Sequence, residues 1–335
     1  MGPTSPGLKD VAKRAGVSVK TVSNVINAYP HVSPTTRSKV QQAIDELGYR
    51  PNQGARLLRT GRSGLVALSV PEMTPYFAEM AELLMNEAEA RGWTVLMDRT
   101  HGERRHERWA AGGISRDLID GLIASPLSMT RADLASARTA LPVVLLGERL
   151  SNVGADHVAI DNVRAAREAT EHLLTSGRTR VAAIGAKGAH DATAALRLEG
   201  YRSALEAAGI AFDEELVRPA PEFHLDDGHA AMQDLLALPR PPDAVFCFND
   251  LLALGALRAA HAAGVVVPDD LAIVGVDDIE QCTYSEPPLT SIRPDKEFIA
   301  RTAVGLLADR IDGDHQRDPQ DVVAPHELRV RGTSG

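Results

Sequence analysis

The stretch VAKRAGVSVKTVSNVIN, residues Val11–Asn27, predicts two short helices joined by a tight turn. On either side of AGVS the apolar residues recur every three or four positions, which is the spacing of one face of a helix. Gly16 can adopt the positive φ that a turn between helices needs, and Ser18 can cap the second helix. The valines and Ile26 of the second helix then face inward, so its polar side chains face solvent.

A third helix is predicted directly after this pair. Ser33 is its N-cap, Pro34 occupies its first position, and an apolar stripe runs to Leu47 before a glycine ends it. Three short helices with a glycine-containing turn between the first two form a helix-turn-helix motif. We therefore predict an all-α DNA-binding domain at residues 8–50, preceded by a disordered tail at residues 1–7.

The outward face of the second helix carries side chains that suit the major groove of DNA. Lys20 can donate to guanine, Asn24 can pair with adenine, and the backbone N–H groups at the helix start can bind a phosphate. A small helical bundle with a polar face is the alternative interpretation. The DNA contacts predicted in this domain are Ser18, Val19, Lys20, Thr21, Ser23, Asn24, Asn27, Ser33 and Thr36.

The charge distribution favours the DNA-binding interpretation. Between Leu8 and Arg62 the chain has ten Lys or Arg residues and three Asp or Glu residues, although its net charge over 335 residues is −9. The rest of the chain therefore carries −16. A small basic segment joined to a large acidic body is typical of a module that binds nucleic-acid phosphates, attached to a domain that does not bind them.

The sequence also argues against several classes of protein. It has no secretion signal and no apolar run of about 18 residues, so we expect neither export nor a membrane span. Cys247 and Cys282 lie in or near apolar runs without metal-binding spacing, which favours two buried thiols in a cytoplasmic, nucleoid-associated protein. Because no catalytic motif or phosphate loop is present, we expect no enzyme, no catalytic residue, no metal and no cofactor.

The basic linker at residues 51–63 is too short to be helical alone in water, so we expect it to fold on a partner. Its arginines suggest that this partner is nucleic acid, and Leu58 could wedge between base pairs in the minor groove. Leu58 could instead pack onto the rest of the protein. The DNA contacts predicted in the linker are Asn52, Ala55, Leu58 and Arg59.

The remaining residues, 64–335, alternate strand-like and helix-like stretches. The predicted strands are LVALSV, TVLMD, GLIAS, VVLLG, HVAID, RVAAIG, AVFCF and LAIVGVD. The predicted helices between them are Phe77–Arg91, Asn162–Ser176, Ala195–Ala208, Asp227–Leu238, Asp250–Ala263 and Asp295–Ile311. This alternation predicts an α/β body of two doubly wound parallel sheets, whose ligands bind beyond the carboxyl ends of the strands.

Polar residues at those strand ends are the binding candidates. They are Gly147 and Glu148, Asp161 and Asn162, Asn249 and Asp250, and Asp277 and Asp278. The pair Asp277 and Asp278 could in principle do acid–base chemistry. Adjacent side chains on an extended strand point in opposite directions, however, so we expect that the two cannot face one substrate.

Motifs along nearly the whole chain, from Leu8 to about His326, resemble the lactose/galactose repressor family of bacterial transcription factors. These motifs are DVAKRAGVSVKTVSNVIN, HVSPTTRSKVQQAIDELGYRPN, GLIASPL, HVAIDN, RLEGYRSAL, FNDLLALGAL, VVVPDDLAIVGVDD and PPLTSI. The resemblance implies a periplasmic-binding-protein-like body that binds an effector and dimerises, with crossings between its two subdomains near residues 161–163 and 290–294. It also implies a homodimer on a pseudo-palindromic operator, in which Leu58 of each hinge inserts at the central step.

The same resemblance implies an effector site between the subdomains. Arg197 matches a ligand-clamping arginine, and Asn249 and Asp277 match residues that bind hydroxyl groups, which suits a sugar. Asn249 could instead simply cap the following helix, and Asp277 could pair within the protein. The effector contacts predicted are Tyr76, Phe77, Glu148, Asp161, Arg197, Phe223, Asn249 and Asp277.

Together these expectations describe an allosteric transcriptional regulator, expected to be a repressor. A small molecule, expected to be a sugar, binds between the subdomains, changes the spacing of the two hinges in the dimer and so alters operator affinity. The rival interpretations are a solute-binding protein without a DNA role and an enzyme that acts on sugars. The basic N-terminal segment argues against the first, and the missing catalytic constellation argues against the second.

Overall fold

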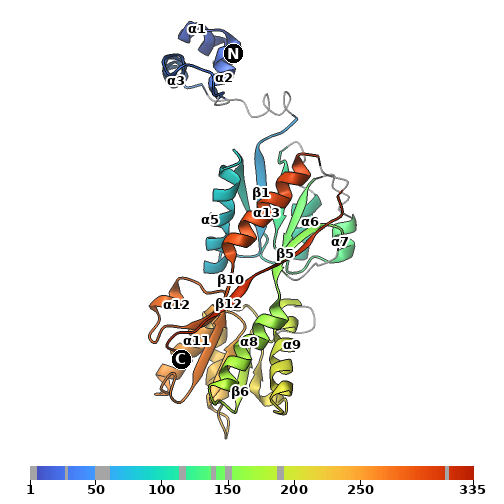
Figure 1. Ribbon diagram of the computed structural model, residues 1–335, viewed down its shortest axis with the longest axis vertical. Coiled ribbons are helices and arrows are strands. Elements are labelled where there is room, and N and C mark those ends of the chain that lie inside the picture. The colour runs from blue at the N-terminus through green and yellow to red at the C-terminus, as the bar shows by residue number, and fades with distance from the viewer. Residues whose placement is uncertain are drawn as a thin grey trace. The chain divides into compact units, whose positions relative to one another are not determined.

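The structure is a computed structural model, which describes residues 6–26, 29–49, 61–112, 118–136, 141–147, 153–186, 192–313 and 317–335. The chain divides into two compact units, Met1–Ser63 and Gly64–Gly335. Figure 1 draws both units, which we call the head and the body.

The head consists of three short helices around one apolar core. They are α1 (Leu8–Ala15), α2 (Val19–Ile26) and α3 (Pro34–Leu47). Each helix contributes a fully buried valine to this core, namely Val11, Val22 and Val40. The apolar spacing that predicted the helices therefore also decides which faces pack together.

The turns of the head follow from single residues. Gly16 ends α1 with a φ of 67°, in the left-handed region that favours glycine. At the start of α2 the backbone N–H of Thr21 donates to Ser18 Oγ at 3.1 Å. At the start of α3 the N–H of Thr36 donates to Ser33 Oγ at 3.3 Å. The predicted helix-turn-helix and its two caps are confirmed.

The described residues of the body form two sheets of six strands each. The first sheet is parallel throughout, in the order β11 (Asp321–Ala324), β5 (Asp156–Ile160), β4 (Val143–Leu146), β3 (Gly121–Ala124), β1 (Leu65–Val70) and β2 (Thr94–Arg99). The second sheet has the order β12 (His326–Arg329), β10 (Thr290–Pro294), β9 (Ala272–Val276), β8 (Ala244–Cys247), β6 (Val181–Ile184) and β7 (Val217–Arg218). In this second sheet β12 runs antiparallel to β10 and the other pairs are parallel. Two doubly wound sheets were predicted, and they are confirmed.

Helices pack against each sheet and complete two lobes. With the first sheet go α5 (Pro75–Glu89), α6 (Arg104–Gly112), α7 (Arg131–Ser136) and α13 (Lys296–Ile311), and together they form the N-lobe. With the second sheet go α8 (Asn162–Thr175), α9 (Ala192–Ala207), the 3-10 turn Glu214–Leu216, α10 (Leu225–Leu236), α11 (Asp250–Ala262) and α12 (Gln281–Tyr284), and they form the C-lobe. Figure 1 shows the two lobes of the body as separate groups of strands and helices.

Within the described part of the body, the chain passes between the lobes at three points. It crosses at Asp161 between β5 and α8, at Asp295 between β10 and α13, and at Pro325 between β11 and β12. The second crossing lies just after the range 290–294, because residues 290–292 pair with β9 and residues 291–294 with β12 in the second sheet. The third crossing was not predicted, since the two short strands that flank it carry little apolar pattern.

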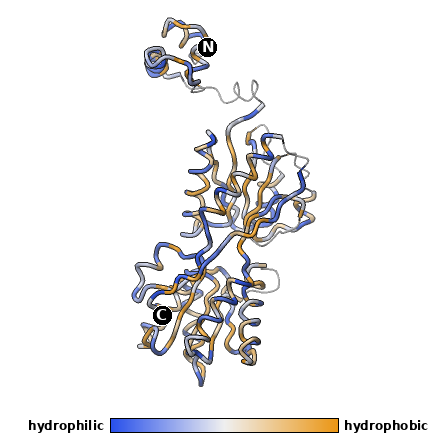
Figure 2. Tube along the Cα trace, in the orientation of Figure 1, coloured by the Kyte–Doolittle hydropathy of each residue, from blue (hydrophilic) through white to orange (hydrophobic). Residues whose placement is uncertain are grey.

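The apolar core of the body lies in the central strands. β3, β8 and β9 are buried along their whole length, as expected for parallel strands covered on both faces. Figure 2 shows hydrophobic segments running through both lobes. Cys247 and Cys282 are buried and unbridged within this core, as predicted. Among the described residues no helix is both long enough and apolar enough to cross a membrane.

Candidate functional site

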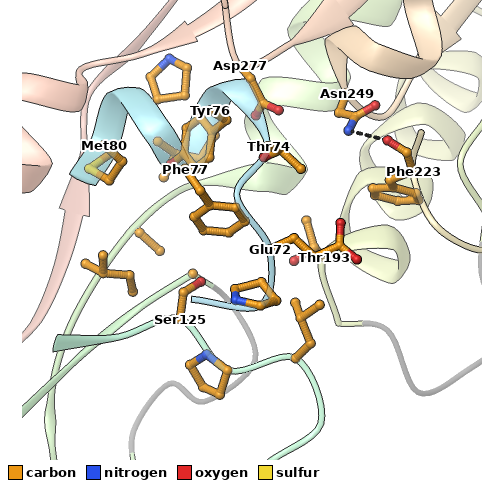
Figure 3. Close-up of a pocket in the computed structure, with 18 of the residues that line it drawn as sticks. Glu72, Thr74, Tyr76, Phe77, Met80, Ser125, Thr193, Phe223, Asn249 and Asp277 are labelled. Atoms are coloured by element: carbon orange, nitrogen blue, oxygen red, sulfur yellow. Dashed lines mark hydrogen bonds between the residues drawn. The ribbon is translucent and has the colours of Figure 1, made fainter. Parts of the chain in front are cut away.

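A cavity of about 230 Å³ lies between the N-lobe and the C-lobe of the body. Its walls include the residues that follow β3, β4, β8 and β9, which is where parallel sheets place their ligands. Figure 3 shows side chains from both lobes converging on this space. Six predicted effector residues line it, namely Tyr76, Phe77, Arg197, Phe223, Asn249 and Asp277.

The N-lobe wall is aromatic. Tyr76 and Phe77 occupy the first turn of α5, which Pro75 begins. Their rings meet edge to face, with centroids 5.3 Å apart and an interplanar angle of 74°. This wall offers ring faces, which can stack on the apolar face of a small ligand.

Arg197 lies on α9 and is held in place by two acceptors. Its side chain is almost completely buried, and Nε donates to Asn162 Oδ1 at 2.6 Å. Nη1 donates to the backbone carbonyl of Phe248. These two bonds fix the orientation of the guanidinium, and neither of them uses Nη2. Arg197 also lines the cavity.

Asn249 caps a helix and also lies at the cavity wall. Its Oδ1 accepts from the backbone N–H of Leu252 at 2.9 Å, so it caps α11. Its Nδ2 donates to the backbone carbonyl of Phe223 at 3.0 Å, which Figure 3 draws as a dashed line. Asn249 also lines the cavity, so the cap and the cavity wall are built from one side chain.

The reasoning about Asp277 and Asp278 needs a correction. β9 ends at Val276, and the two aspartates follow it with φ values of 111° and 46°, so they do not lie on an extended strand. Their side chains still diverge, because Asp277 lines the cavity whereas Asp278 pairs with Arg331 at 2.7 Å. The two carboxylates therefore do not form a pair at the cavity wall.

Two predicted effector residues are not among the side chains described at the cavity. Asp161 is the N-cap of α8, and its Oδ1 accepts from the N–H of Arg164 at 2.9 Å. Asp161 lies at a crossing between the lobes. Its position at the end of β5 was predicted correctly, but its side chain caps a helix and is not part of the cavity wall. Glu148 lies outside the described residues, although Gly147 before it lines the cavity.

Several polar residues line the cavity without having been predicted. They are Glu72, Thr74, His101, Ser125, Thr193 and Glu222. A signal for some of them was present, because Ser125 directly follows β3 and Glu72 follows β1 by two residues. Applying the strand-end rule to every strand would have found both of these side chains.

A buried carboxylate stands behind the cavity wall. Asp250 is fully buried and accepts from the N–H of Ile279 at 3.0 Å, from Cys282 Sγ at 3.1 Å and from Ser291 Oγ at 2.6 Å. Burial, and then the charge of Asp277, raise the pKa of Asp250 to about 8. The charge of the cavity carboxylate therefore disfavours ionisation of the core carboxylate.

A buried lysine joins the lobes beside the cavity. Lys296 is only 3% exposed, and its Nζ donates to Glu79 Oε2 in the N-lobe and, at 3.1 Å, to the carbonyl of Asp278 in the C-lobe. The ammonium also lies 5.7 Å from the centroid of the Tyr76 ring, within cation–π range. One charge thus contacts both lobes and an aromatic side chain of the cavity.

The head presents the predicted DNA-facing residues on one side of α2. Ser18, Val19 and Lys20 are exposed, and Thr21, Ser23 and Asn24 are partly exposed, whereas Val22 and Val25 are buried. At the start of α3, Ser33 is exposed and its Oγ donates to Thr36 Oγ1 at 2.9 Å. The other predicted contacts, Asn27, Asn52, Ala55, Leu58 and Arg59, lie outside the described residues.

A basic helix-turn-helix head and a two-lobed body with an interlobe cavity define a class of protein, the ligand-responsive DNA-binding regulator. Comparisons with known proteins agree. Residues 7–52 match the family model of bacterial regulatory proteins, lacI family, and residues 170–334 match the periplasmic binding protein-like domain. The chain belongs to the lacI family of bacterial regulatory proteins.

Relatives of similar length support this membership. The HTH-type transcriptional regulator CelR of Thermobifida fusca is 38% identical over 338 residues, which cover 97% of each chain. The HTH-type transcriptional repressor CytR of Escherichia coli (strain K12) is 35% identical over 335 residues, which cover 99% of this chain and 97% of CytR. This protein is a DNA-binding transcriptional regulator, and these relatives are regulators as well.

Solved structures of regulators share the whole architecture. A CelR–cellobiose complex has a TM-score of 0.72 and 36% identity, and the match covers 98% of this chain and 99% of that one. The lac repressor dimer bound to operator and the anti-inducer ONPF has a TM-score of 0.83 and 27% identity, with 99% of each chain covered. The predicted fold class and family are confirmed.

Proposed function

We propose that this protein represses transcription from a specific operator and that a sugar bound between its lobes controls its affinity for that operator. The observation that carries the proposal is the convergence of Arg197, Asn249 and Asp277 with aromatic side chains on one interlobe cavity. The cavity belongs to a chain whose other unit is a basic helix-turn-helix. In this proposal the protein acts in the cytoplasm and catalyses no reaction.

The chemistry of the cavity suits a polyol. Carboxylate and amide oxygens accept hydrogen bonds from hydroxyl groups, and a guanidinium donates to them. The rings of Tyr76 and Phe77 can cover the apolar face of a pyranose. The relative CelR has been solved with cellobiose, which makes that disaccharide the first probe for this chain.

The operator contacts are proposed on the exposed side of α2. Lys20 donates to guanine acceptors, and Asn24 pairs with adenine in the major groove. The linker residues Asn52, Ala55, Leu58 and Arg59 are proposed to enter the minor groove, with Leu58 as the wedge. A homodimer presents two heads to a pseudo-palindromic site. The lac repressor has been solved as a dimer bound to operator.

Control of DNA binding is proposed to act through the lobes. A sugar that binds the closed cavity more tightly than the open one shifts the lobes towards closure. In a dimer this shift changes the spacing of the two linkers and hence the affinity for the operator. A coupling free energy of about 1–3 kcal/mol is ordinary for such systems.

Two variants test the separation of the modules. An operator selected from random duplexes by the purified full-length protein is the DNA probe, and cellobiose is the ligand probe. Lys20→Ala is expected to weaken operator binding by about tenfold or more without changing cellobiose affinity. Arg197→Met is expected to abolish cellobiose binding but to leave operator binding without ligand intact.

Fluorescence anisotropy measures the operator affinity, and calorimetry measures the cellobiose affinity. Each variant is the control for the other. If the wild-type protein binds cellobiose but prefers no duplex sequence, it is a solute-binding protein and the proposed DNA role is wrong. If neither variant changes its own ligand's affinity, the assignment of residues to the two sites is wrong.

A further inference from the structure

The turn at residues 222–224 carries backbone strain at the cavity. Phe223 has a φ of 58°, in the left-handed region that a bulky residue rarely adopts. Phe223 and Glu222 both line the cavity, and Figure 3 shows the Phe223 ring on the side of the cavity opposite Phe77. A strained aromatic residue persists only where its surroundings hold it, and such strain gathers at functional sites.

Two side chains form hydrogen bonds to the backbone of this turn. Asp227, in the first turn of α10, accepts from the N–H of Glu222 at 3.0 Å and from the N–H of His224 at 3.3 Å, both through Oδ2. Asn249 donates to the carbonyl of Phe223 at 3.0 Å. The backbone is therefore bonded on both sides of Phe223 and at Phe223 itself.

The same turn also reaches the other lobe. Nε2 of His224 lies 3.0 Å from Oε2 of Glu72, which follows β1 in the N-lobe and lines the cavity. Because Asp227 accepts the N–H of His224, it fixes the residue that makes this interlobe contact. The side chains of His224 and Glu72 are both more than a third exposed, so solvent weakens their interaction. The geometry of this contact therefore depends on the backbone position of His224.

We propose that Asp227 is a positioning residue for effector recognition: it holds Phe223 in its strained conformation against the ligand and holds His224 against Glu72 across the cavity. Asp227 does not line the cavity itself, so it acts through the turn at residues 222–224. The proposal rests on the proposed function in one respect, which is that the ligand in this cavity is a sugar.

The first experiment needs no ligand. Hydrogen exchange of the full-length protein, resolved to single amides by mass spectrometry, reports the bonds that Asp227 accepts. Asp227→Ala is expected to speed exchange at the Glu222 and His224 amides by about tenfold, because a bond to a carboxylate is lost at each. Asp226→Ala removes a carboxylate from the same helical turn and is the matched control, with exchange at both amides unchanged.

The second experiment asks whether Asp227 acts through Phe223. With cellobiose as the probe, Asp227→Ala is expected to raise the dissociation constant about tenfold, and Asp227→Asn, which keeps one acceptor oxygen, is expected to recover part of the loss. In a Phe223→Ala background the same Asp227→Ala change is expected to alter the dissociation constant by less than about twofold. Operator affinity without ligand is expected to be the same in the wild-type protein, Asp227→Ala and Asp227→Asn.

The outcomes separate the two proposals. If the wild-type protein does not bind cellobiose, the sugar proposal loses its first probe, and the exchange experiment alone decides the role of Asp227. Equal exchange in Asp227→Ala and Asp226→Ala would overturn the positioning role. So would a loss of cellobiose affinity that is the same with and without the Phe223 ring. If Asp227→Ala does not fold, Asp227→Asn takes its place with smaller expected changes in the same directions, because an amide oxygen accepts more weakly than a carboxylate.

Discussion

Asn249 uses both ends of its side-chain amide within the protein and still lines the cavity. Capping and ligand binding were alternative interpretations of this residue in the sequence, but the fold makes them compatible. The cap fixes the side chain, and a fixed side chain binds a ligand without losing further rotamer freedom. Arg197 follows the same logic, because Asn162 and the Phe248 carbonyl orient it before any ligand arrives.

The buried carboxylate of Asp250 is expected to make folding stability depend on pH. Its pKa of about 8 lies above the value of about 3.9 expected in the unfolded chain. The folded protein therefore retains a proton that the unfolded chain has released, and this contribution is complete below about pH 4 and is lost as the pH rises to about 8. From pH 5 to pH 8 the free energy of unfolding is expected to fall by about 1 kcal/mol per pH unit from this group.

Urea unfolding of the wild-type protein and Asp250→Asn across this range measures the effect. The amide cannot ionise, so the variant is expected to lack this component of the slope, whatever its stability at a single pH. Parallel pH profiles for the two proteins would show that Asp250 is ionised in the folded state at pH 5. The three donors around its oxygens would then outweigh its burial.

Lys296→Met is expected to lower the free energy of unfolding by about 1–3 kcal/mol. The methionine preserves packing but leaves the carbonyl of Asp278 without the donor that it has in the wild-type protein. Glu79→Gln is the comparison, and its expected cost is under about 1 kcal/mol, because the glutamine oxygen can still accept from the ammonium and this end of the pair is 46% exposed. Urea unfolding measures both; an equal loss in the two variants would mean that the ion pair, not the bond to Asp278, carries the stability.

At the scale of elements, two glycines decide how closely α10 and α11 pack. A Cβ on Gly228 would lie 2.1 Å from the carbonyl oxygen of Leu252, and one on Gly255 would lie 2.1 Å from that of Leu225. Neither backbone can accommodate the extra carbon without moving. This close contact brings the first turn of α10, which carries Asp227, beside the first turn of α11, which Asn249 caps.

Gly255→Ala is therefore expected to lower the free energy of unfolding by about 1–3 kcal/mol or more through overpacking. Gly305→Ala in α13 is the matched control, because a Cβ at that position would have no neighbouring atom within 4 Å and alanine favours the helix. This control is expected to raise the free energy of unfolding by about 1 kcal/mol. Opposite signs in urea unfolding support the packing argument; a gain in both variants would refute it.

The predictability of the elements follows the apolar runs in their own sequences more closely than their burial, because β2 is largely exposed and was predicted, whereas β10 is largely buried and was not. The eight strands with apolar runs were predicted to within about one residue, from β1 at Leu65–Val70 to β9 at Ala272–Val276. The strands β7, β10, β11 and β12 were not predicted, and neither were the helices α6, α7 and α12. β7, β11 and β12 are short and partly exposed, so their pairing partners rather than their own residues define them.

At the scale of the whole molecule, a charged head and an acidic body respond differently to salt. The logarithm of the operator association constant is expected to fall linearly with the logarithm of salt concentration, because bound phosphates release counterions. Cellobiose affinity is expected to show no comparable slope, since a neutral sugar releases none. Titrations at several salt concentrations measure both, and a salt-independent operator affinity would exclude phosphate contacts by the head.

The coupling between the two sites is expected to be reciprocal. If saturating cellobiose changes the operator dissociation constant by some factor, saturating operator must change the cellobiose dissociation constant by the same factor. Anisotropy and calorimetry on one protein preparation give the two factors independently. Unequal factors would mean that cellobiose binds at more than one site or that the dimer dissociates during the titration.

The sequence by itself determined the order and type of the main elements, the helix-turn-helix with its caps at Ser18 and Ser33, and the positions of Asn249 and Asp277 at strand ends. The other four predicted cavity residues followed from the family resemblance. Apolar periodicity, caps and strand ends are local patterns, so neighbouring residues suffice to reveal them. Only the tertiary structure decided that Asp277 and Asp278 leave the extended conformation, that Asn249 donates to the Phe223 carbonyl and that His224 meets Glu72. The last two contacts join partners distant in the sequence, and no local pattern encodes them.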